Sequence, residues 1–210
     1  YEDSLGNLWI GTNSGLYILD QTRKSVREFH YGYDMKFATL LRNNRINSIL
    51  ADSTGTMWLA TQFGLYALRN GRMTSYFKGN DADGLLSDEI NALTIDMHGR
   101  IWIGSTGGVN YIDPKSGKIV ALELNNGKKV FNEQVLSLTC DQVGRLLIGT
   151  RAGLNVLSFG EDAVISLEPI LSLDNEMITS VMTDDKRRVW VSSSRGISML
   201  SVEGVVRSFD

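Results

Sequence analysis

The sequence has little cysteine, proline and histidine: its 210 residues include one cysteine, two prolines and two histidines. The lone Cys140 allows no internal disulfide and no cysteine metal cluster, and it does not fix the compartment. Two histidines are too few for a convincing zinc site. No apolar run approaches the roughly 20 residues that a membrane-spanning helix needs. Because no signal peptide opens the chain and Tyr1 is its first residue, we expect an excised or processed segment.

The sequence also lacks an excess of basic residues. Its 21 Lys and Arg residues are outnumbered by 24 Asp and Glu, which gives a net charge of -3. Surfaces that bind nucleic acid are normally basic, so no nucleic-acid partner is expected. Glycine, in contrast, is abundant, with 21 residues, and together with so little proline it indicates many tight turns rather than disorder.

Those glycines belong to an internal repeat. Five segments follow the pattern D-x-x-G-x-Φ-W-Φ-G-T-x-x-G-Φ, where Φ is apolar, without a gap. They are DSLGNLWIGTNSGL (3–16), DSTGTMWLATQFGL (52–65), DMHGRIWIGSTGGV (96–109), DQVGRLLIGTRAGL (141–154) and DDKRRVWVSSSRGI (184–197). The anchor residues Trp9, Trp58, Trp102, Leu147 and Trp190 are 49, 44, 45 and 43 residues apart. A fixed period of this length predicts a repeat architecture.

The similarity extends upstream of the motif. An aliphatic residue stands twelve positions before each later anchor, at Ile46, Ile90, Val135 and Ile178. A small residue follows it by two positions, at Ser48, Ala92, Ser137 and Ser180. A polar residue precedes it by three, at Asn43, Ser87, Asn132 and Asn175. The repeats therefore divide the chain into units 1–45, 46–89, 90–134, 135–177 and 178–210.

Each unit is predicted to form four antiparallel strands. In the second unit, INSILAD is apolar on both faces, the Asp52–Gly55 turn leads to TMWLAT, and the hairpin signal Asn70-Gly71 joins LYALR to RMTSYF. A four-stranded meander with a period of about 44 residues is typical of a β-propeller blade. The fold class predicted is thus an all-β propeller with about five blades, forming one partial domain over residues 1–210.

The repeated residues are interpreted as structural. The tryptophans are expected to wedge between blades, since Leu147 replaces one of them and leucine packs but does not stack. The small residues suit an innermost strand crowded around the axis. The repeated turn glycines complete the scaffold: Gly15, Gly64, Gly108, Gly153 and Gly196.

The phase of the repeat indicates an incomplete propeller. The first unit begins at its Asp turn and lacks an inner strand, whereas the last unit has all four strands. Two unsatisfied blade faces are a liability. We therefore expect either the remaining blades of a parent propeller or a second copy of the chain to cover them; a closed five-bladed ring is the alternative.

The repeat resembles that of the two-component regulator propellers, which form the sensor region of hybrid two-component histidine kinases of gut Bacteroidetes. The resemblance spans nearly the whole chain and rests on Asp3, Gly6, Trp9, Gly11 and their counterparts, together with LLSDEINAL at residues 85–93. The fifth repeat departs from it, with Arg187 at the turn glycine and Ser192-Ser193 for Gly-Thr.

The resemblance implies a periplasmic sensor that is anchored in the inner membrane by a segment outside this chain. It implies seven-bladed propellers that recognise glycan fragments, control polysaccharide utilisation and signal through dimerisation. The kinase and regulator parts would lie elsewhere, so this segment is predicted to be non-catalytic and to use no cofactor.

Candidate ligand contacts lie where the second-to-third strand loops meet the connections between blades, because propellers usually bind ligands on that face. The candidate residues vary between repeats; they are Asn13, Gln62, Phe63, Arg151, Arg195, Arg45, Glu89 and Glu133. Thr106, Asp88, Asn132 and Glu176 occupy related positions. Unconstrained loops would vary in the same way.

Two features of this face are distinctive. Arg151 and Arg195 hold equivalent positions in adjacent repeats and could grip an anionic sugar or a carboxylate together, or remain two solvated arginines. The long first connection, residues 30–45, carries Tyr31, Tyr33 and Phe37, which could stack on a sugar or, as we favour, cover a blade edge.

Enzyme chemistry finds little support in the sequence. His30 and His98 stand at non-equivalent positions, and the repeated aspartates are explained as turn caps. The segment Asp81–Gly84 is too short for a calcium loop, so no metal site is predicted. Two rivals to the sensor remain: a propeller that only spaces or dimerises other domains, and a lyase similar to the streptogramin-inactivating family.

Overall fold

The computed structural model describes residues 1–29, 41–42, 44–79, 84–122, 133–159, 164–170, 173–201 and 206–209. Of the residues singled out above, His30, Tyr31, Tyr33, Phe37, Asn43, Asp81, Asp83 and Asn132 lie outside these ranges. Within the described residues, no helix is long and apolar enough to cross a membrane.

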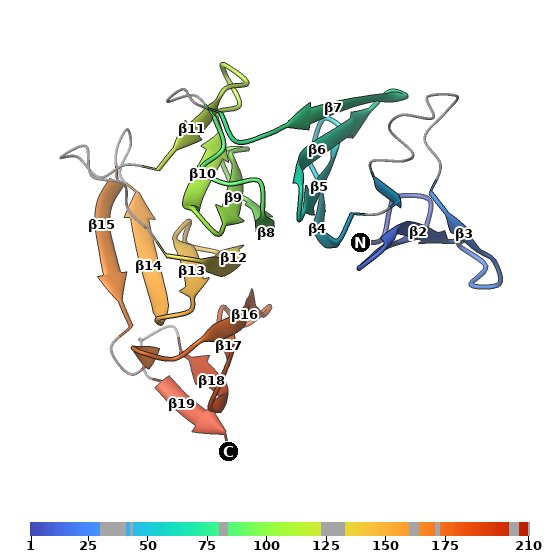
Figure 1. Ribbon diagram of the computed structural model, residues 1–210. Helices are drawn as coiled ribbons and strands as arrows, with labels where there is room; N and C mark the ends of the chain where they lie inside the picture. Colours follow the sequence, from blue (N-terminus) through green and yellow to red (C-terminus); the bar gives the residue numbers. More distant parts are fainter. Residues whose placement is uncertain are drawn as a thin grey trace.

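The described residues form five antiparallel sheets, which we call blades 1 to 5 (Figure 1). Blade 1 consists of β1 (Leu8–Thr12), β2 (Gly15–Leu19) and β3 (Val26–Glu28). Blade 2 consists of β4 (Ile46–Ala51), β5 (Met57–Thr61), β6 (Gly64–Arg69) and β7 (Arg72–Tyr76). Blade 3 consists of β8 (Ile90–Ile95), β9 (Ile101–Ser105), β10 (Gly108–Ile112) and β11 (Ile119–Ala121). Blade 4 consists of β12 (Val135–Cys140), β13 (Leu146–Thr150), β14 (Leu154–Phe159) and β15 (Val164–Pro169). Blade 5 consists of β16 (Ile178–Thr183), β17 (Val189–Ser193), β18 (Gly196–Leu200) and β19 (Val206–Phe209).

In blades 2 to 5 the strands follow one another in sequence order, which confirms the predicted all-β propeller architecture. The first strand of each of these blades lies toward the centre of the arc and the fourth lies outside (Figure 1). Blade 1 has three strands, as its repeat phase predicts. An isolated bridge between Glu2 and Leu8 occupies the edge where the inner strand of the other blades pairs.

The turns have the conformations that their residues favour. Asn70 and Gly71 both have positive φ, 47° and 72°, as the two-residue hairpin between β6 and β7 requires. The glycine of the first turn of each blade is also left-handed, for example Gly55 at φ 79°. In blade 5 this place belongs to Arg187, which takes φ 61° although it carries a Cβ.

Hydrogen bonds near the axis join the inner strands of neighbouring blades. The side-chain amide of Asn47 donates to the Ile90 carbonyl at 2.8 Å, and that of Asn91 donates to the Val135 carbonyl at the same distance. Both asparagines lie in the β-bulge that interrupts their inner strand. Blade 4 uses Ser137 instead, whose hydroxyl accepts from the backbone N–H of Val181 at 2.9 Å.

The second-strand glycine of the repeat provides room for the next blade. A Cβ added at Gly104 would lie 2.6 Å from Cγ1 of Val135, and one at Gly149 would lie 2.7 Å from Cγ2 of Ile178. The glycine in one repeat and the aliphatic residue that opens the next are therefore in contact, which explains why both recur with the same period.

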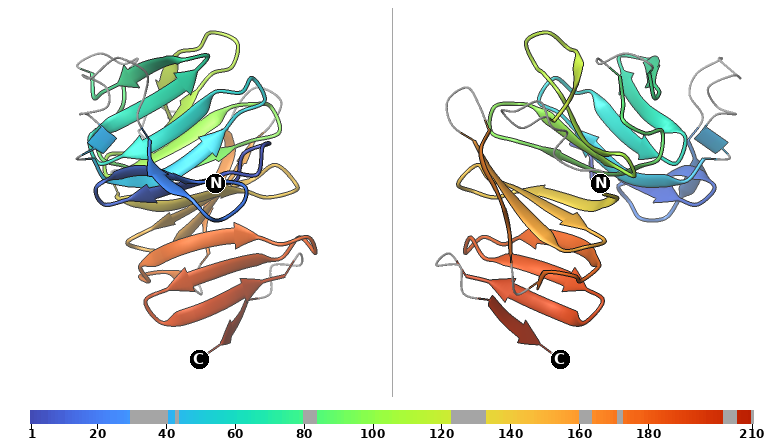
Figure 2. Two further views of the ribbon diagram at one scale, coloured as in Figure 1. Left: turned by 90° about the vertical axis from the view of Figure 1, so that its right-hand side faces the viewer. Right: turned by 60° about the vertical axis from the view of Figure 1, so that its left-hand side comes forward.

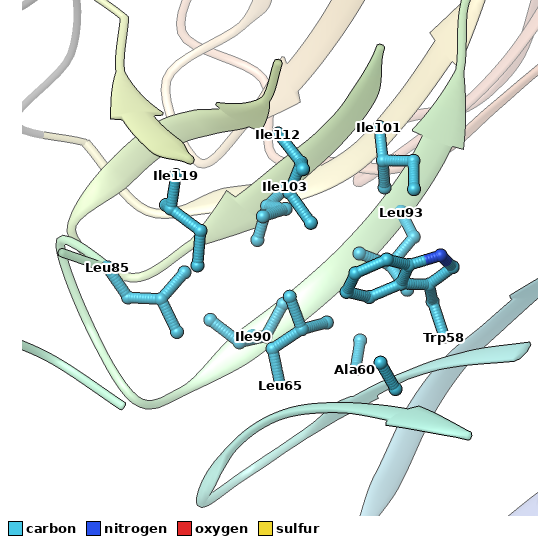
Figure 3. Packing of buried hydrophobic residues seen from close by; sticks show 11 residues of the cluster. Trp58, Ala60, Leu65, Leu85, Ile90, Leu93, Ile101, Ile103, Ile112 and Ile119 are labelled. Atoms are coloured by element: carbon cyan, nitrogen blue, oxygen red, sulfur yellow. The ribbon is translucent and has the colours of Figure 1, made fainter. Parts of the chain in front are cut away.

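Four apolar clusters fill the interfaces between successive blades. Trp58 of blade 2 belongs to one cluster with Ile101, Ile112 and Ile119 of blade 3. In Figure 3 Trp58 lies near Leu93 at one end of this cluster, and Ile119 lies near Leu85 at the other. Trp102 belongs in the same way to the interface of blades 3 and 4, and Leu147 to that of blades 4 and 5. The anchor residues of blades 2, 3 and 4 thus pack against the following blade.

Blades 1 and 5 each have one sheet face, at the two ends of the arc, that carries exposed apolar side chains. Ile10 on β1 is 37% exposed, whereas its equivalents Leu59, Ile103 and Ile148 are fully buried. At the other end, Ile197 on β18 is 51% exposed, although its counterparts on the third strands of the other blades are buried. Figure 2 shows the same arrangement, with blade 5 and the C-terminus at one end of the arc.

Candidate functional site

Loops and blade connections meet on one face of the arc, which we call the turn–crossover face. It consists of the loops between second and third strands (13–14, 62–63, 106–107, 151–152 and 194–195) and the described connections (41–42, 44–45, 84–89, 133–134 and 173–177). The two sets are joined by recurring backbone bonds, from Gln62 N–H to the Arg45 carbonyl at 3.0 Å and from Thr106 N–H to the Glu89 carbonyl at 3.1 Å. This juxtaposition is the one that the sequence predicts.

The threonine of the motif fixes each loop. The Thr61 hydroxyl donates to the Gly64 carbonyl at 2.8 Å and accepts from the N–H of Phe63 at 3.1 Å. Thr12 and Thr150 make the same pair of bonds in blades 1 and 4. These bonds fix the backbone of the loop between the threonine and the glycine, and in blade 2 the side chains of Gln62 and Phe63 are exposed to solvent.

Most of the predicted ligand residues are exposed on this face. Phe63 is 58% exposed although it is aromatic. Glu89 is half-buried, and the remaining members of the set are exposed: Asn13, Arg45, Gln62, Glu133, Arg151 and Arg195. The residues come from loops that follow one another along the arc, so they form a row that crosses several blades.

The two loop arginines are each held by their own connection. The Arg151 Nε atom donates to the Gln134 side-chain carbonyl at 2.6 Å. The Arg195 guanidinium forms an ion pair with Glu176 at 3.4 Å, and the same carboxylate accepts from the Ser193 hydroxyl at 2.5 Å. Arg195 thus has a compensating charge, whereas Arg151 is hydrogen-bonded to a neutral amide.

Ser87, Thr106 and Glu176, which the sequence places near this face, have polar contacts there that the sequence does not predict. The hydroxyls of Ser87 and Thr106 lie 2.7 Å apart and tie the connection before blade 3 to its loop. The Glu176 carboxylate is nearly fully buried. The signal for both was their matching position before the inner strand, but only the folded chain shows which loop residue each one meets.

The repeated aspartates lie on the opposite face, in the turns between first and second strands. Asp52 accepts from the N–H groups of Thr54 and Thr56 at 2.9 and 3.0 Å, and its other oxygen accepts from Trp58 Nε1 at 2.9 Å. The same set recurs at Asp3, Asp96 and Asp184. Each carboxylate is therefore occupied within its own blade.

The one cysteine and the one described histidine are accounted for by their surroundings. Burial raises the pKa of the Cys140 thiol to about 12, so the thiol stays protonated at neutral pH and is a poor nucleophile. His98 is exposed in its turn, where its N–H donates to Asp96 at 2.9 Å. Across the described ranges, His, Cys, Asp and Glu form no cluster of three that could hold a metal ion.

The chain is similar to solved propellers from signalling proteins. It is 26% identical to the extracellular domain of a protein described as a hybrid two-component system of B. thetaiotaomicron, over 92% of this chain and 25% of that one, with a TM-score of 0.71. A second such domain from the same organism is 22% identical over 99% of this chain and 29% of its own, with a TM-score of 0.79, which shows the fold alone. The chain thus spans about a quarter of the length of these structures.

The fold also occurs in an enzyme. A catalytically inactive virginiamycin B lyase of Staphylococcus aureus is 11% identical over all of this chain and 68% of its own, with a TM-score of 0.73. At this identity the likeness shows the fold alone. A search of curated proteins finds no match to the chain.

The family model described as two-component regulator propeller matches residues 40–63 and 84–107. Each match runs from the connection before a blade, through its inner strand and Asp turn, to the loop after its second strand. Two segments of the chain, which include the inner halves of blades 2 and 3, are therefore similar to two-component regulator propeller repeats.

Proposed function

We propose that the chain is part of the extracytoplasmic sensor region of a hybrid two-component histidine kinase and response regulator. The observation that carries this proposal is the pair of matched propeller repeats, together with the likeness to extracellular domains of such systems. In this proposal the chain has no catalytic role, and the periplasmic propeller reports to kinase and regulator parts outside it.

The signal that we propose is a glycan fragment bound on the turn–crossover face. The loops there have a backbone fixed by threonine and connection bonds, so a ligand would find pre-organised side chains. Phe63 offers an exposed ring to a sugar face, and Gln62 and Asn13 offer amide groups for hydroxyls. Arg151, which has no charged partner among the described residues, suits an acidic group.

The exposed faces of blades 1 and 5 support a second part of the proposal. Ile10 and Ile197 are exposed where the equivalent residues of inner blades are buried. Further blades of the parent propeller would cover both faces, and dimerisation of the sensor would transmit the signal. A propeller that only spaces other domains would have the same scaffold but no ligand.

The experiment is a titration calorimetry series with the intact ectodomain and a panel of neutral and acidic oligosaccharides. We expect one class to bind, and we expect Gln62→Ala with Phe63→Ala to weaken binding by about tenfold or more, as for loss of a stacked ring and a hydrogen bond. Val143→Ser is the matched control, because Val143 is 59% exposed in a turn on the other face. Binding of no oligosaccharide would favour the spacer.

A further inference from the structure

A groove lies between blades 2 and 3 on the face opposite the turn–crossover face. Its volume is about 980 Å³, and turns of both blades line it. Blade 2 contributes Trp58, Tyr76, Arg69 and Arg72, and blade 3 contributes His98 and the turn after Asp113. We call it the blade 2–3 groove. The repeat pattern gave no reason to expect a cavity at this one interface.

Comparison with the next interface explains why the groove is open. Between blades 3 and 4, the Arg100 guanidinium lies 4.6 Å from the Phe159 ring and 5.3 Å from the Trp102 ring, and the two rings are 5.1 Å apart. These side chains occupy the space beside the anchor tryptophan.

Smaller residues stand at the equivalent positions of blades 2 and 3. Thr56 precedes Trp58 by two residues, as Arg100 precedes Trp102. Pro114 follows Gly108 by six residues, as Phe159 follows Gly153. Both Thr56 and Pro114 line the groove. The cavity therefore arises where two side chains that fill the neighbouring interface are missing.

The groove holds two arginines that are not ion-paired among the described residues, together with the carboxylates of Asp52 and Asp113. Arg69 and Arg72 face each other directly across the β6–β7 hairpin and both line the groove. In the described part of the chain neither has an ion pair or a hydrogen bond to its guanidinium. Two like charges directly opposite on a hairpin repel each other, so an anion between them would relieve the repulsion.

The acidic groups of the groove do not compete for these arginines. Asp52 accepts from the Trp58 indole and from its own turn. Asp113 accepts from the hydroxyl and N–H of Ser116 at 2.6 and 3.0 Å. Both carboxylates are satisfied by neutral donors, which leaves the arginine pair free for a ligand.

An aromatic surface lies further along the same groove, at the other end of β7. Tyr76 is half-buried, and its ring centroid lies 5.9 Å from that of Trp58, which is nearly buried. Tyr76 is on the same face of the hairpin as Arg72 and Thr74. Thr74 lies between Arg72 and Tyr76 on β7, and four residues of an extended strand span about 13 Å, so an oligosaccharide with an acidic group is long enough to reach both ends.

We propose that the blade 2–3 groove binds an acidic saccharide, with its carboxylate or sulfate on Arg69 and Arg72 and a sugar ring against Tyr76. The choice of a saccharide rests on the proposed glycan-sensing function, but the site is separate from the turn–crossover face. His98 and Thr74 stand at the same groove and are available for the sugar hydroxyls.

The test is calorimetric titration of the protein with trigalacturonic acid, with maltotriose as the neutral trisaccharide and sodium sulfate as the inorganic anion. We expect the acidic trisaccharide to bind at least about tenfold more tightly than either of the others, since it alone offers both charge and ring. The double change Arg69→Ala and Arg72→Ala should abolish that preference, and Tyr76→Ala should weaken the acidic trisaccharide without affecting sulfate.

Two further variants sharpen the test. Arg207→Ala removes an exposed arginine on blade 5 and should leave binding unchanged. The pair Thr56→Arg and Pro114→Phe copies the filled interface of blades 3 and 4 and should close the groove. Thermal unfolding checks that each variant folds. If the Thr56→Arg, Pro114→Phe variant does not fold, the Arg69→Ala, Arg72→Ala variant still tests the proposal, because both arginines are exposed.

The outcomes separate this inference from the proposed function. The proposed groove site is overturned if the protein binds the acidic and the neutral trisaccharide with equal affinity. It is also overturned if the acidic trisaccharide still binds after both arginines are replaced. If saccharide binding depends on Gln62 and Phe63 instead of the arginines, the result supports the sensor function and overturns the proposed groove site. Sulfate binding as tight as that of the acidic trisaccharide also overturns it, because the site would then recognise an anion and no saccharide.

Discussion

At the scale of single residues, the carboxylate of the repeated aspartate accepts two kinds of hydrogen bond. One oxygen caps the turn and the other accepts from the anchor tryptophan, as Asp96 does from Trp102 at 3.0 Å. The bond ties a surface turn to the buried interface between blades. In blade 4, where Leu147 offers no donor, Arg145 Nε donates to Asp141 at 2.7 Å and takes over the second oxygen.

These bonds make the fold sensitive to acid. Burial disfavours the charge of Asp3, but donation from Trp9, Asn7 and the turn outweighs it and lowers the pKa to about 2. The pKa values of Asp52 and Asp96 are lowered by the same balance. A carboxylate with a depressed pKa in the folded state stabilises the fold above its unfolded pKa, and this contribution disappears as pH falls through the folded value.

We therefore expect the free energy of unfolding to be steady near neutral pH and to fall between about pH 4 and pH 2. Asp96→Asn should cost about 1–3 kcal/mol at pH 7, because its amide would present a donor to the buried Trp102 indole. The variant should also lose less stability in acid. Urea unfolding at several pH values measures both effects, with Asp185→Asn as the exposed control; an Asp96 variant with the parent's acid profile would contradict the explanation.

The spacing of residues in the sequence predicts some of the hydrogen bonds of the repeated aspartate, but not all of them. The Asp and Gly of the turn are readable from residue type, since an aspartate caps such turns and a glycine takes positive φ. That the aspartate also returns to the tryptophan ring six residues later is not readable, because it depends on the register of β5 against β4. For the same reason Glu176 could be placed near the face, but its bonds to Ser193 and Arg195 could not be foreseen.

At the scale of elements, the interface between blades is the unit of stability. A blade has two apolar faces, and each becomes buried only when a neighbour packs on it. Trp102 lies in such an interface and is 1% exposed. Trp190 on blade 5 is half-buried, and its ring contacts Phe209 and Arg188 of its own sheet.

Replacing the two tryptophans should therefore have unequal costs. We expect Trp102→Ala to lower the free energy of unfolding by about 3–5 kcal/mol, as for a large core residue that leaves a cavity. Trp190→Ala should cost clearly less, because no following blade packs against it in this chain. Urea denaturation at neutral pH compares them, and equal losses would show that the environment of the blade face does not set the cost.

Four strands per repeat and their order follow from alternation and turn residues, so the elements are largely predictable from sequence. The blade 2–3 groove is not, because it depends on Thr56 and Pro114 meeting across two repeats that are 44 residues apart. A single repeat does not say which of its positions face the neighbour. The packing of the first connection, with Tyr31, Tyr33 and Phe37, stays a prediction.

At the scale of the whole molecule, the arc ends in two apolar faces. Ile10 and Val26 are exposed on blade 1, and Met182, Ile197 and Phe209 are exposed on blade 5. Exposed apolar patches of this kind mark surfaces that normally have a partner. The faces are of opposite sense, since blade 1 offers the side that a preceding blade would cover and blade 5 the side that a following blade would cover.

Faces of opposite sense can pair head to tail between copies of the chain, and such pairing does not require a closed ring. We expect residues 1–210 alone to self-associate, with a mass by light scattering above the 23.3 kDa of one chain. Ile10→Ser with Ile197→Ser should shift the mass toward a single chain. Val143→Ser should not, although it removes an even more exposed apolar side chain, because Val143 lies in a turn. A monodisperse 23 kDa species in the unmodified chain would contradict the need for a partner on these faces, and with it the inference that further blades cover them.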